Sequence, residues 1–310
     1  MLLLKILMNL MNMSTKKVVF IVGPTAIGKT ALSIKLAQHF NTEIISCDSR
    51  QFYKELLIGA APPNENELEK IKHHFIHNLS VTNSYNAGKF EVDALLTIEE
   101  LHQKHDVLIA IGGSGLYVDA ICKGFDKLPK ISSKTREKIN SDYNKLGIEW
   151  LQKEVQKIDP KFYESCDKNN PQRLLRALEV YKETGKTFSS FKTNKHKERP
   201  FEIIKIGLNI DREKLYSRIN KRVDIMMNDG LLAEVISLEQ HQNLNALQTV
   251  GYKEIFSFLN NETTLENAVE QIKQNTRRFA KRQLTWFRKE KNIKWFEPQE
   301  VEEIKTFIGL

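Results

Sequence analysis

Cysteines, long apolar runs and repeats are scarce or missing in this chain, and each absence excludes a class of protein. Three cysteines, Cys47, Cys122 and Cys166, lie far apart in 310 residues and fit no zinc spacing or disulfide framework. This usage suits a reducing compartment, and we expect a cytoplasmic protein. No segment reaches the about 20 apolar residues that cross a bilayer, so we expect no membrane association. The eight histidines include no H-E-x-x-H zinc motif.

The bulk composition indicates a globular chain with an anionic partner. Hydrophobic residues make up 41% of the sequence, which is enough for a sizeable core, and the length predicts about two domains. The net charge of +8 favours a nucleic acid or a phosphorylated ligand, although a solvated lysine-rich surface has the same composition. Residues 1–15 carry no cleavage-site pattern, so we interpret them as a frayed extension, with Met11 or Met13 as alternative starts.

A glycine-rich loop follows the first expected strand. Residues 18–22 are apolar, residues 31–37 are typical of a helix, and between them the chain reads G-x-x-x-x-G-K-T. Strand, loop and helix in this order form the phosphate-binding loop of nucleotide-binding and ATP-binding proteins, in which backbone amides and a helix N-terminus hold an anion. Lys29 is expected to add a full positive charge and the Thr30 hydroxyl to hold Mg²⁺. The predicted diphosphate-binding residues are Gly23, Pro24, Thr25, Ala26, Ile27, Gly28, Lys29 and Thr30.

Further apolar strands alternate with helices, which predicts an α/β fold. Strand-like runs occur near residues 42–47, 106–111 and 201–210, and helical patterns separate them. Apolar strands of this kind belong to a parallel sheet with helices on both faces, here a P-loop-type core. Ligands bind beyond the carboxyl ends of such strands, where the phosphate loop, Asp48 and Gly112–Gly115 are expected to meet.

The stretch from 126 to 199 has helical patterns and no convincing strand. Its clearest helix runs from Gln172 to Thr184, with Asn170 as the cap, Pro171 at the first position and Gly185 at the stop. We interpret this stretch as a mostly helical insertion domain. The core then comprises residues 16–125 and residues 200–310, of which the second part carries basic C-terminal helices.

The last long helix is expected to begin with a capping box formed by Thr263 and Glu266. Its apolar stripe would comprise Leu265, Val269, Ile272, Thr276 and Phe279, with Trp286 and Phe287 also in the core. Arg277 and Arg278 each have a basic residue four positions later, and such like-charge pairs cost a few tenths of a kcal/mol unless an anion offsets them. The helix therefore favours an RNA or phosphate partner over a solvated face.

Asp48 is the candidate general base. It follows a short strand, next to the phosphate loop, although a turn or cap residue is the alternative reading. The more hydrophobic strand at 107–111 ends in glycines without a carboxylate, which argues against a nucleotide hydrolase. Ser49, Arg50 and Gln51 follow Asp48, and they form either an ordinary polar loop or groups that bind phosphate and an adenine edge.

Taken together, nine segments resemble the tRNA dimethylallyltransferases, also called tRNA isopentenyltransferases, of the bacterial branch. The resemblance covers residues 17–290 almost completely, and there is no C-terminal zinc module. The most specific segments are DSRQ at 48–51, GGSGLY at 112–117, PQRLLRALEVY at 171–181 and TRRFAKRQLTWFR at 276–288; GPTAIGKT at 23–30 is generic, and HHFI, YNAGKFEVDA, DREKLYSRINKRVD and QTVGYKE add to the match.

The resemblance implies a Mg²⁺-dependent prenyl transferase that modifies tRNA. It would move a dimethylallyl group from dimethylallyl diphosphate to N6 of the adenosine 3′ of the anticodon, in tRNAs that read codons beginning with U. The products would be N6-(dimethylallyl)adenosine and diphosphate, and the target base would be flipped out of the anticodon stem-loop. Asp48, Lys29 and Thr30 would be the catalytic residues. We expect a monomer.

The resemblance also implies which residues contact tRNA, and the charge pattern of the last long helix adds Arg277 and Arg278. The complete set is Asp48, Ser49, Arg50, Gln51, Ser114, Arg136, Gln172, Arg173, Leu174, Leu175, Arg176, Gln248, Thr249, Val250, Gly251, Tyr252, Lys253, Arg277 and Arg278.

Three departures from the family pattern leave alternatives open. The loop Ile58–Pro63 lacks the Thr and Lys usual in the family, Ser114 replaces a Thr, and Lys72 replaces a Pro. One alternative is a kinase or isopentenyltransferase acting on free adenine nucleotides, which would need neither the insertion nor the basic last helix. Another is an inactive tRNA-binding paralogue, against which the intact Lys29, Thr30 and Asp48 argue.

Overall fold

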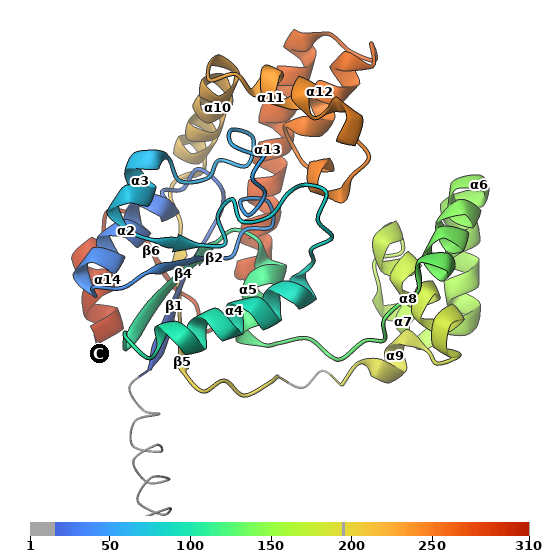
Figure 1. Ribbon diagram of the computed structural model, residues 1–310, viewed down its shortest axis with the longest axis horizontal. Helices are drawn as coiled ribbons and strands as arrows, with labels where there is room; N and C mark the ends of the chain where they lie inside the picture. The colour runs from blue at the N-terminus through green and yellow to red at the C-terminus, as the bar shows by residue number, and fades with distance from the viewer. Residues whose placement is uncertain (1–15, 194–195, 310) are drawn as a thin grey trace, which may run out of the picture. The chain divides into compact units, whose positions relative to one another are not determined.

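The computed structural model describes residues 16–193 and 196–309, which divide into two compact units (Figure 1). Gly124–Lys197 form one unit, and the segments before and after it form the other. The expected insertion, 126–199, begins two residues after the start of the smaller unit and ends two residues after its end. The extension at residues 1–15 is outside the described residues.

One six-stranded sheet lies at the centre of the larger unit, counting the described residues alone. Its order is β3-β2-β4-β1-β5-β6, and every neighbouring pair is parallel. The strands are β1 (Lys17–Val22), β2 (Ile44–Ser46), β3 (His73–His74), β4 (Val107–Gly112), β5 (Glu202–Leu208) and β6 (Lys294–Phe296). The α/β prediction is therefore confirmed.

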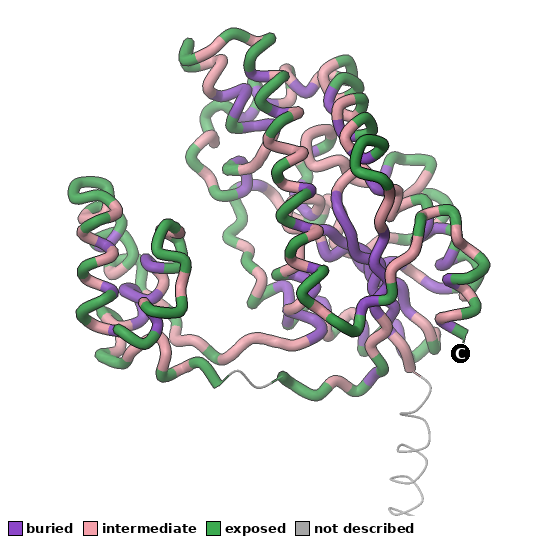
Figure 2. The backbone as a smooth tube through the Cα atoms, turned by 180° about the vertical axis from the view of Figure 1, so that it is seen from behind, coloured by how far each residue is buried: buried purple, intermediate pink, exposed green. Residues whose placement is uncertain are grey.

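Helices cover both faces of this sheet. The helix α2 (Lys29–His39) leads from β1 to β2, and α4 (Ala87–Leu101) leads from β3 to β4. These two connections cross the sheet in opposite directions, so right-handed crossovers place them on opposite faces. Both faces are thus shielded from water, which explains why the central strands are almost continuously buried (Figure 2).

Most of the remaining helices of the larger unit follow β5 in the sequence. They are α3 (Glu65–Lys70), α5 (Gly115–Cys122), α10 (Arg212–Asn228), α11 (Leu231–Ser237), α12 (Tyr252–Leu259), α13 (Leu265–Phe287) and α14 (Val301–Gly309). Side chains from α2, α10, α13 and α14 share one apolar cluster with β1, β4 and β5. Asp211 caps α10, because its side chain accepts hydrogen bonds from the backbone of Glu213 and Lys214.

The predicted start of α13 is wrong by one residue. Thr264 is the N-cap and accepts a hydrogen bond from the Asn267 N–H, so the capping box of Thr263 and Glu266 does not form. The expected apolar stripe is also shifted, because Leu265, Val269 and Phe279 are only partly buried. The buried line is Ala268, Ile272, Ala280, Gln283 and Phe287, in which small alanines and one amide replace the bulky side chains that a hydrophobicity pattern selects.

In the described residues of the smaller unit, all of the regular secondary structure is helical. It comprises α6 (Ser133–Ile158), α7 (Pro160–Ser165), α8 (Pro171–Thr184) and α9 (Phe188–Phe191), and Gly147 interrupts α6 with a φ of +75°. The prediction for α8 is confirmed: Asn170 accepts from the Arg173 N–H, and Gly185 ends the helix with a left-handed φ of +71°. Leu174 and Leu178 bury the inner side of α8 against α6 in the unit's own core.

Candidate functional site

The carboxyl edge of β1, β2 and β4 brings the phosphate loop, Asp48 and the glycine turn together. The register places Val22, which precedes the loop, opposite Gly112, which precedes the turn. The backbone N–H of Cys47, next to Asp48, donates to the Ile111 carbonyl over 2.7 Å. The sheet therefore aligns the three segments that the sequence placed at this edge.

The phosphate loop has the backbone shape of an anion cradle. Ala26 has a φ of 62° and Gly28 a φ of 106°, and α2 begins directly afterwards at Lys29. Left-handed residues alternating with ordinary ones turn successive N–H groups toward one side, and the helix N-terminus adds its partial positive charge. This geometry suits a bound phosphate group.

Lys29 closes this loop from inside. Its ammonium group donates to the Gly23 carbonyl over 3.1 Å and to the Pro24 carbonyl over 2.8 Å. Burial lowers the pKa of Lys29 to about 7, the charge of Asp48 opposes that shift, and Arg222 adds to it. A bound anion would restore the ordinary preference of Lys29 for the charged form.

Two arginines that the sequence analysis missed reach the loop from α10. Arg218 donates to the Ile27 carbonyl and Arg222 to the Thr25 hydroxyl, each over 3.3 Å. They are four residues apart and so lie on one side of the helix. That spacing is visible in the sequence, but the sequence analysis assigned no functional residue to this helix.

Asp48 is held in a tight turn beside the loop. Its Oδ1 accepts the Arg50 N–H over 2.9 Å. Burial raises the pKa of Asp48, while this hydrogen bond and the positive charges of Lys29 and Arg50 oppose the rise. A carboxylate with a raised pKa binds a proton more readily than an exposed aspartate, as a general base requires.

The predicted contact residues next to Asp48 differ in how far their side chains are already engaged in hydrogen bonds within the protein. Ser114 accepts the Ser49 N–H over 3.2 Å, and its hydroxyl also donates to the Ser49 hydroxyl over 3.3 Å. The Gln51 amide is engaged at both ends: it accepts from the Ser46 hydroxyl over 3.0 Å and donates to the Ala61 carbonyl over 2.9 Å. Gln51 would therefore have to exchange partners to read a base.

Gln283 is a second residue that the sequence analysis missed. From the buried side of α13, its Oε1 accepts the Thr25 N–H over 2.9 Å, and its Nε2 donates to the Gly113 carbonyl over 3.0 Å. A Cβ on Gly113 would lie 2.2 Å from this Nε2, and one on Gly115 would lie 2.3 Å from the Trp286 ring. These glycines allow α13 to approach, and Gln283 ties the phosphate loop to the glycine turn.

The loop at 58–63 is fixed without the family's Thr and Lys. Glu234 on α11 accepts the N–H groups of Ile58 and Gly59 over 2.7 and 3.0 Å, and it accepts the Tyr252 hydroxyl over 2.6 Å. A Cβ on Gly59 would lie 2.5 Å from the Tyr252 ring. Tyr252 therefore packs under this loop, fully buried, while its predicted companions Gln248 and Lys253 are exposed.

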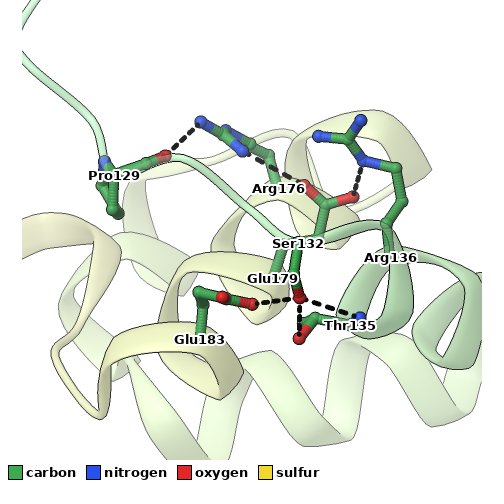
Figure 3. Close-up of polar contacts among 7 residues, drawn as sticks. All are labelled: Pro129, Ser132, Thr135, Arg136, Arg176, Glu179 and Glu183. Carbon is green, nitrogen blue, oxygen red and sulfur yellow. Dashed lines mark hydrogen bonds and ion pairs between the residues drawn. The ribbon is translucent and has the colours of Figure 1, made fainter.

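In the smaller unit the predicted RNA contacts divide between core and surface. Leu174 and Leu175 are buried in the core of the unit, whereas Gln172 and Arg173 of the same motif are exposed. Arg136 on α6 and Arg176 on α8 both form ion pairs with Glu179 (Figure 3). The sequence analysis did not single out Glu179.

Arg277 and Arg278 are neighbours on α13 but lie in different environments. Arg277 donates to the Asn220 Oδ1 on α10 over 2.6 Å, whereas Arg278 is exposed and donates to Asn275 over 3.3 Å. Of the two aromatic residues expected in the core, Phe287 is buried and Trp286 is half-buried over Gly115.

The donor groups present fit a magnesium ion that arrives with its ligand. The described part of the chain contains no cluster of three or more His, Cys, Asp or Glu residues able to hold a metal. Thr30 is the second residue of α2, beside the cradle. Mg²⁺ commonly takes one or two protein oxygens and completes its shell with substrate phosphates and water, so the Thr30 hydroxyl suits it.

None of the helices in the described ranges is both long and apolar enough to cross a membrane.

Comparison with known proteins gives consistent matches over most of the chain. A profile described as IPP transferase matches residues 51–290. The chain is 56% identical to a tRNA dimethylallyltransferase of Christiangramia forsetii over 277 residues, covering 89% of this chain and 92% of the relative. It is 54% identical to the tRNA dimethylallyltransferase of Flavobacterium johnsoniae over 288 residues, covering 91% and 93%.

Two solved structures are similar in fold. The full-length tRNA isopentenylpyrophosphate transferase of Bacillus halodurans matches with a TM-score of 0.71 and 36% identity, over 95% of this chain and 96% of that one. A eukaryotic dimethylallyltransferase acting on tRNA matches with a TM-score of 0.76 and 28% identity, over 94% of this chain and 76% of that one.

Proposed function

We propose, from the premise that this chain belongs to the IPP transferase family, that it is a tRNA dimethylallyltransferase. It transfers the dimethylallyl group of dimethylallyl diphosphate to N6 of the adenosine 3′ of the anticodon, in tRNAs that read codons beginning with U. The observation that carries the proposal is the placement of Asp48 beside Lys29 in a phosphate cradle, where each charge shifts the pKa of the other.

The cradle provides for the leaving group. As the bond between the allylic carbon and the diphosphate oxygen breaks, negative charge grows on the diphosphate. The N–H groups of the loop, Lys29 and Arg222 surround the position where that charge develops, and electrostatic stabilisation of this kind is a major source of catalysis. A Mg²⁺ ion held by Thr30 would supply further positive charge to the same oxygens.

Asp48 provides for the acceptor. The new bond joins the allylic carbon to N6, and the nitrogen becomes acidic as it gains positive charge. Asp48 then accepts the N6 proton, so the reaction yields the alkylated adenosine, diphosphate and a protonated carboxyl group. An adenine amino group is a very weak acid beforehand, which is why a carboxylate can serve only after bond formation is under way.

The acceptor is a base within tRNA, because the chain carries more exposed basic side chains than the binding of a single nucleotide requires. Exposed basic side chains on α13 and the arginine pair of the smaller unit suit the phosphates of an RNA backbone. The base itself would be flipped out of the anticodon loop to reach Asp48. We further propose that the enzyme acts as a cytoplasmic monomer.

The alternatives have less support. A kinase or isopentenyltransferase of free adenine nucleotides would leave the basic residues of the smaller unit without a role. An inactive paralogue was suggested by the altered 58–63 loop, but Glu234, Gln51 and Tyr252 hold this loop in place.

Replacing the proposed base tests the mechanism. Asp48→Asn keeps an oxygen for the Arg50 N–H but cannot take up the N6 proton. We expect kcat for prenyl transfer to fall by about 10²–10⁴-fold, with tRNA binding within about threefold of the wild type. Asp106→Asn, at an exposed carboxylate paired with Lys16, is the matched control and should leave kcat unchanged. A fully active Asp48→Asn enzyme would remove Asp48 from the base role.

A further inference from the structure

A buried carboxylate in the smaller unit joins two arginines from different helices. Glu179 on α8 is 7% exposed. Its Oε1 accepts from the Arg136 Nε and its Oε2 from an Arg176 terminal nitrogen, each over 3.2 Å (Figure 3). Both carboxylate oxygens are thus used, one for each guanidinium group.

Burying a carboxylate costs free energy unless charged partners compensate for the lost water. A single cation would neutralise Glu179, but here two are present, and the group keeps a net charge of +1. The Arg136 side chain is 52% exposed and that of Arg176 is 31% exposed. The surplus charge therefore faces solvent, where an anion can meet it.

The way each arginine is held leaves hydrogen-bond donors in reach. Arg136 uses only its Nε toward Glu179, so its two terminal nitrogens point away from the carboxylate (Figure 3). Those two nitrogens have no hydrogen-bond partner in the described ranges. They form the planar fork that binds two phosphate oxygens at once. Arg176 also donates to the Pro129 carbonyl over 3.4 Å, which restrains it further.

The frame that carries Glu179 is rigid. Helix α8 is capped at both ends and buries Leu174 and Leu178 against α6. One turn after Glu179, Glu183 accepts the Ser132 hydroxyl over 3.0 Å, and Ser132 is the N-cap of α6 (Figure 3). The start of α6, which carries Arg136, is thereby fixed to α8.

We propose that Glu179 is a positioning residue that holds Arg136 and Arg176 as one phosphate-binding fork for the tRNA backbone. The inference rests on the proposed function, since it names how that substrate is gripped. Without the carboxylate, two long side chains of like charge would separate and sample many rotamers, and each would lose orientational freedom again on binding RNA.

The sign of the effect separates positioning from simple charge. Removing Glu179 raises the net charge of the protein by one, so attraction to RNA alone would tighten binding. Loss of a positioned fork would weaken it. The test therefore compares Glu179→Ala and Glu179→Gln with Glu149→Gln, which raises the charge equally at an exposed position of α6 in the same unit.

Binding of unmodified tRNA is measured by fluorescence anisotropy at several salt concentrations, together with prenyl transfer kinetics. For Glu179→Ala we expect the tRNA Kd and KM to rise about tenfold. The slope of log K against log salt should fall by the amount expected for the loss of about one to two phosphate contacts. Its kcat and the affinity for dimethylallyl diphosphate should stay within about threefold. Glu149→Gln should bind tRNA as tightly as the wild type or slightly tighter.

Glu179→Gln keeps the shape of the side chain, so it preserves the test if Glu179→Ala unfolds. Its amide keeps an acceptor oxygen at one of the two carboxylate positions and has an NH2 donor at the other, so one guanidinium group loses its partner. We expect a rise in the tRNA Kd of about threefold. Adding Arg136→Gln to this variant should produce less than the product of the two single effects, because Glu179 acts through Arg136.

If the wild type binds and prenylates tRNA but Glu179→Gln binds tRNA equally well or more tightly, the positioning role of Glu179 is wrong. The proposed function would not be affected by that result. A wild type that binds dimethylallyl diphosphate but no tRNA would contradict the proposed function instead.

Discussion

Lys29 lies between a carboxylate and a guanidinium group, and its protonation controls how well the phosphate loop attracts an anion. Burial lowers the pKa of Lys29 to about 7, with Asp48 opposing this effect and Arg222 strengthening it. Near neutral pH the empty loop therefore contains a mixture of charged and neutral lysine. Binding of a diphosphate favours the charged form, so it must take up a proton whenever Lys29 begins neutral.

The affinity for dimethylallyl diphosphate should consequently fall as pH rises above about 7. A single linked proton limits the change to about tenfold per pH unit. Isothermal titration in two buffers of different ionisation enthalpy at pH 8 should show uptake approaching one proton. Lys29→Arg, which stays charged, corrects for ionisation of the ligand itself. Equal proton uptake by wild type and Lys29→Arg would show that Lys29 does not carry the linkage.

Single residues also show where the sequence could not predict the site. The loop motif identified Lys29 and Thr30 because spacing alone defines it. Gln283 was overlooked because a buried amide has no periodic signal, and only the three-dimensional approach of α13 reveals its two partners. Glu234 was similarly hidden, and Tyr252 was predicted as a tRNA contact rather than as a support for the 58–63 loop. Both supporting roles depend on contacts with a loop that lies far away in the sequence.

At the scale of elements, α13 has two functions on its two sides. Its buried side places Gln283 between the phosphate loop and the glycine turn, and Trp286 over Gly115. Its outer side carries exposed basic residues such as Arg278 and Lys281. One helix thus supports the phosphate loop on its buried side and exposes positive charge on its outer side.

Gln283→Met should disturb the donor loop while keeping the volume of the side chain. The Thr25 N–H and the Gly113 carbonyl would lose their partners, and one buried unsatisfied group costs about 1–3 kcal/mol. We expect the Kd for dimethylallyl diphosphate to rise about tenfold and tRNA binding to be unaffected. Gln274→Met, on the exposed side of the same helix, is the control. Unaltered donor affinity in Gln283→Met would exclude this link.

The outer side of α13 makes a separate prediction. Arg277→Gln with Arg278→Gln should reduce the slope of log K against log salt for tRNA by up to about 1.4–1.8. Lys70→Gln with Lys104→Gln removes the same charge from exposed positions elsewhere and should change the slope little. Identical slopes in the two double variants would mean that α13 does not contact RNA.

Elements with strong local signals were predictable, and those without were not. The strand and helix around the phosphate loop, and the capped helix α8, follow from apolar periodicity and from Asn170 and Gly185. The short strands β3 and β6 were missed because two or three residues show no periodicity and pair only through the sheet. The start of α13 was misplaced because Thr263 and Thr264 are both acceptable caps, and only the geometry selects Thr264.

For the whole molecule, the decisive feature is that phosphate chemistry and RNA-binding charge occur in the same chain. The larger unit holds the cradle and Asp48, and the smaller unit holds the arginine pair on Glu179. The excess of eight positive charges suits a polyanionic acceptor far better than a single nucleotide. A test of which acceptor the protein uses therefore depends on residues of both units.

The most direct measurement is a competition between acceptors. Purified protein is mixed with Mg²⁺, radiolabelled dimethylallyl diphosphate, unmodified tRNA that reads a codon beginning with U, and an excess of AMP. We predict that the label enters tRNA at N6 of the adenosine 3′ of the anticodon, that AMP stays unlabelled, and that Asp48→Asn slows the transfer by about 10²–10⁴-fold. Label in AMP, or no label in tRNA under conditions where the donor binds, would contradict this function.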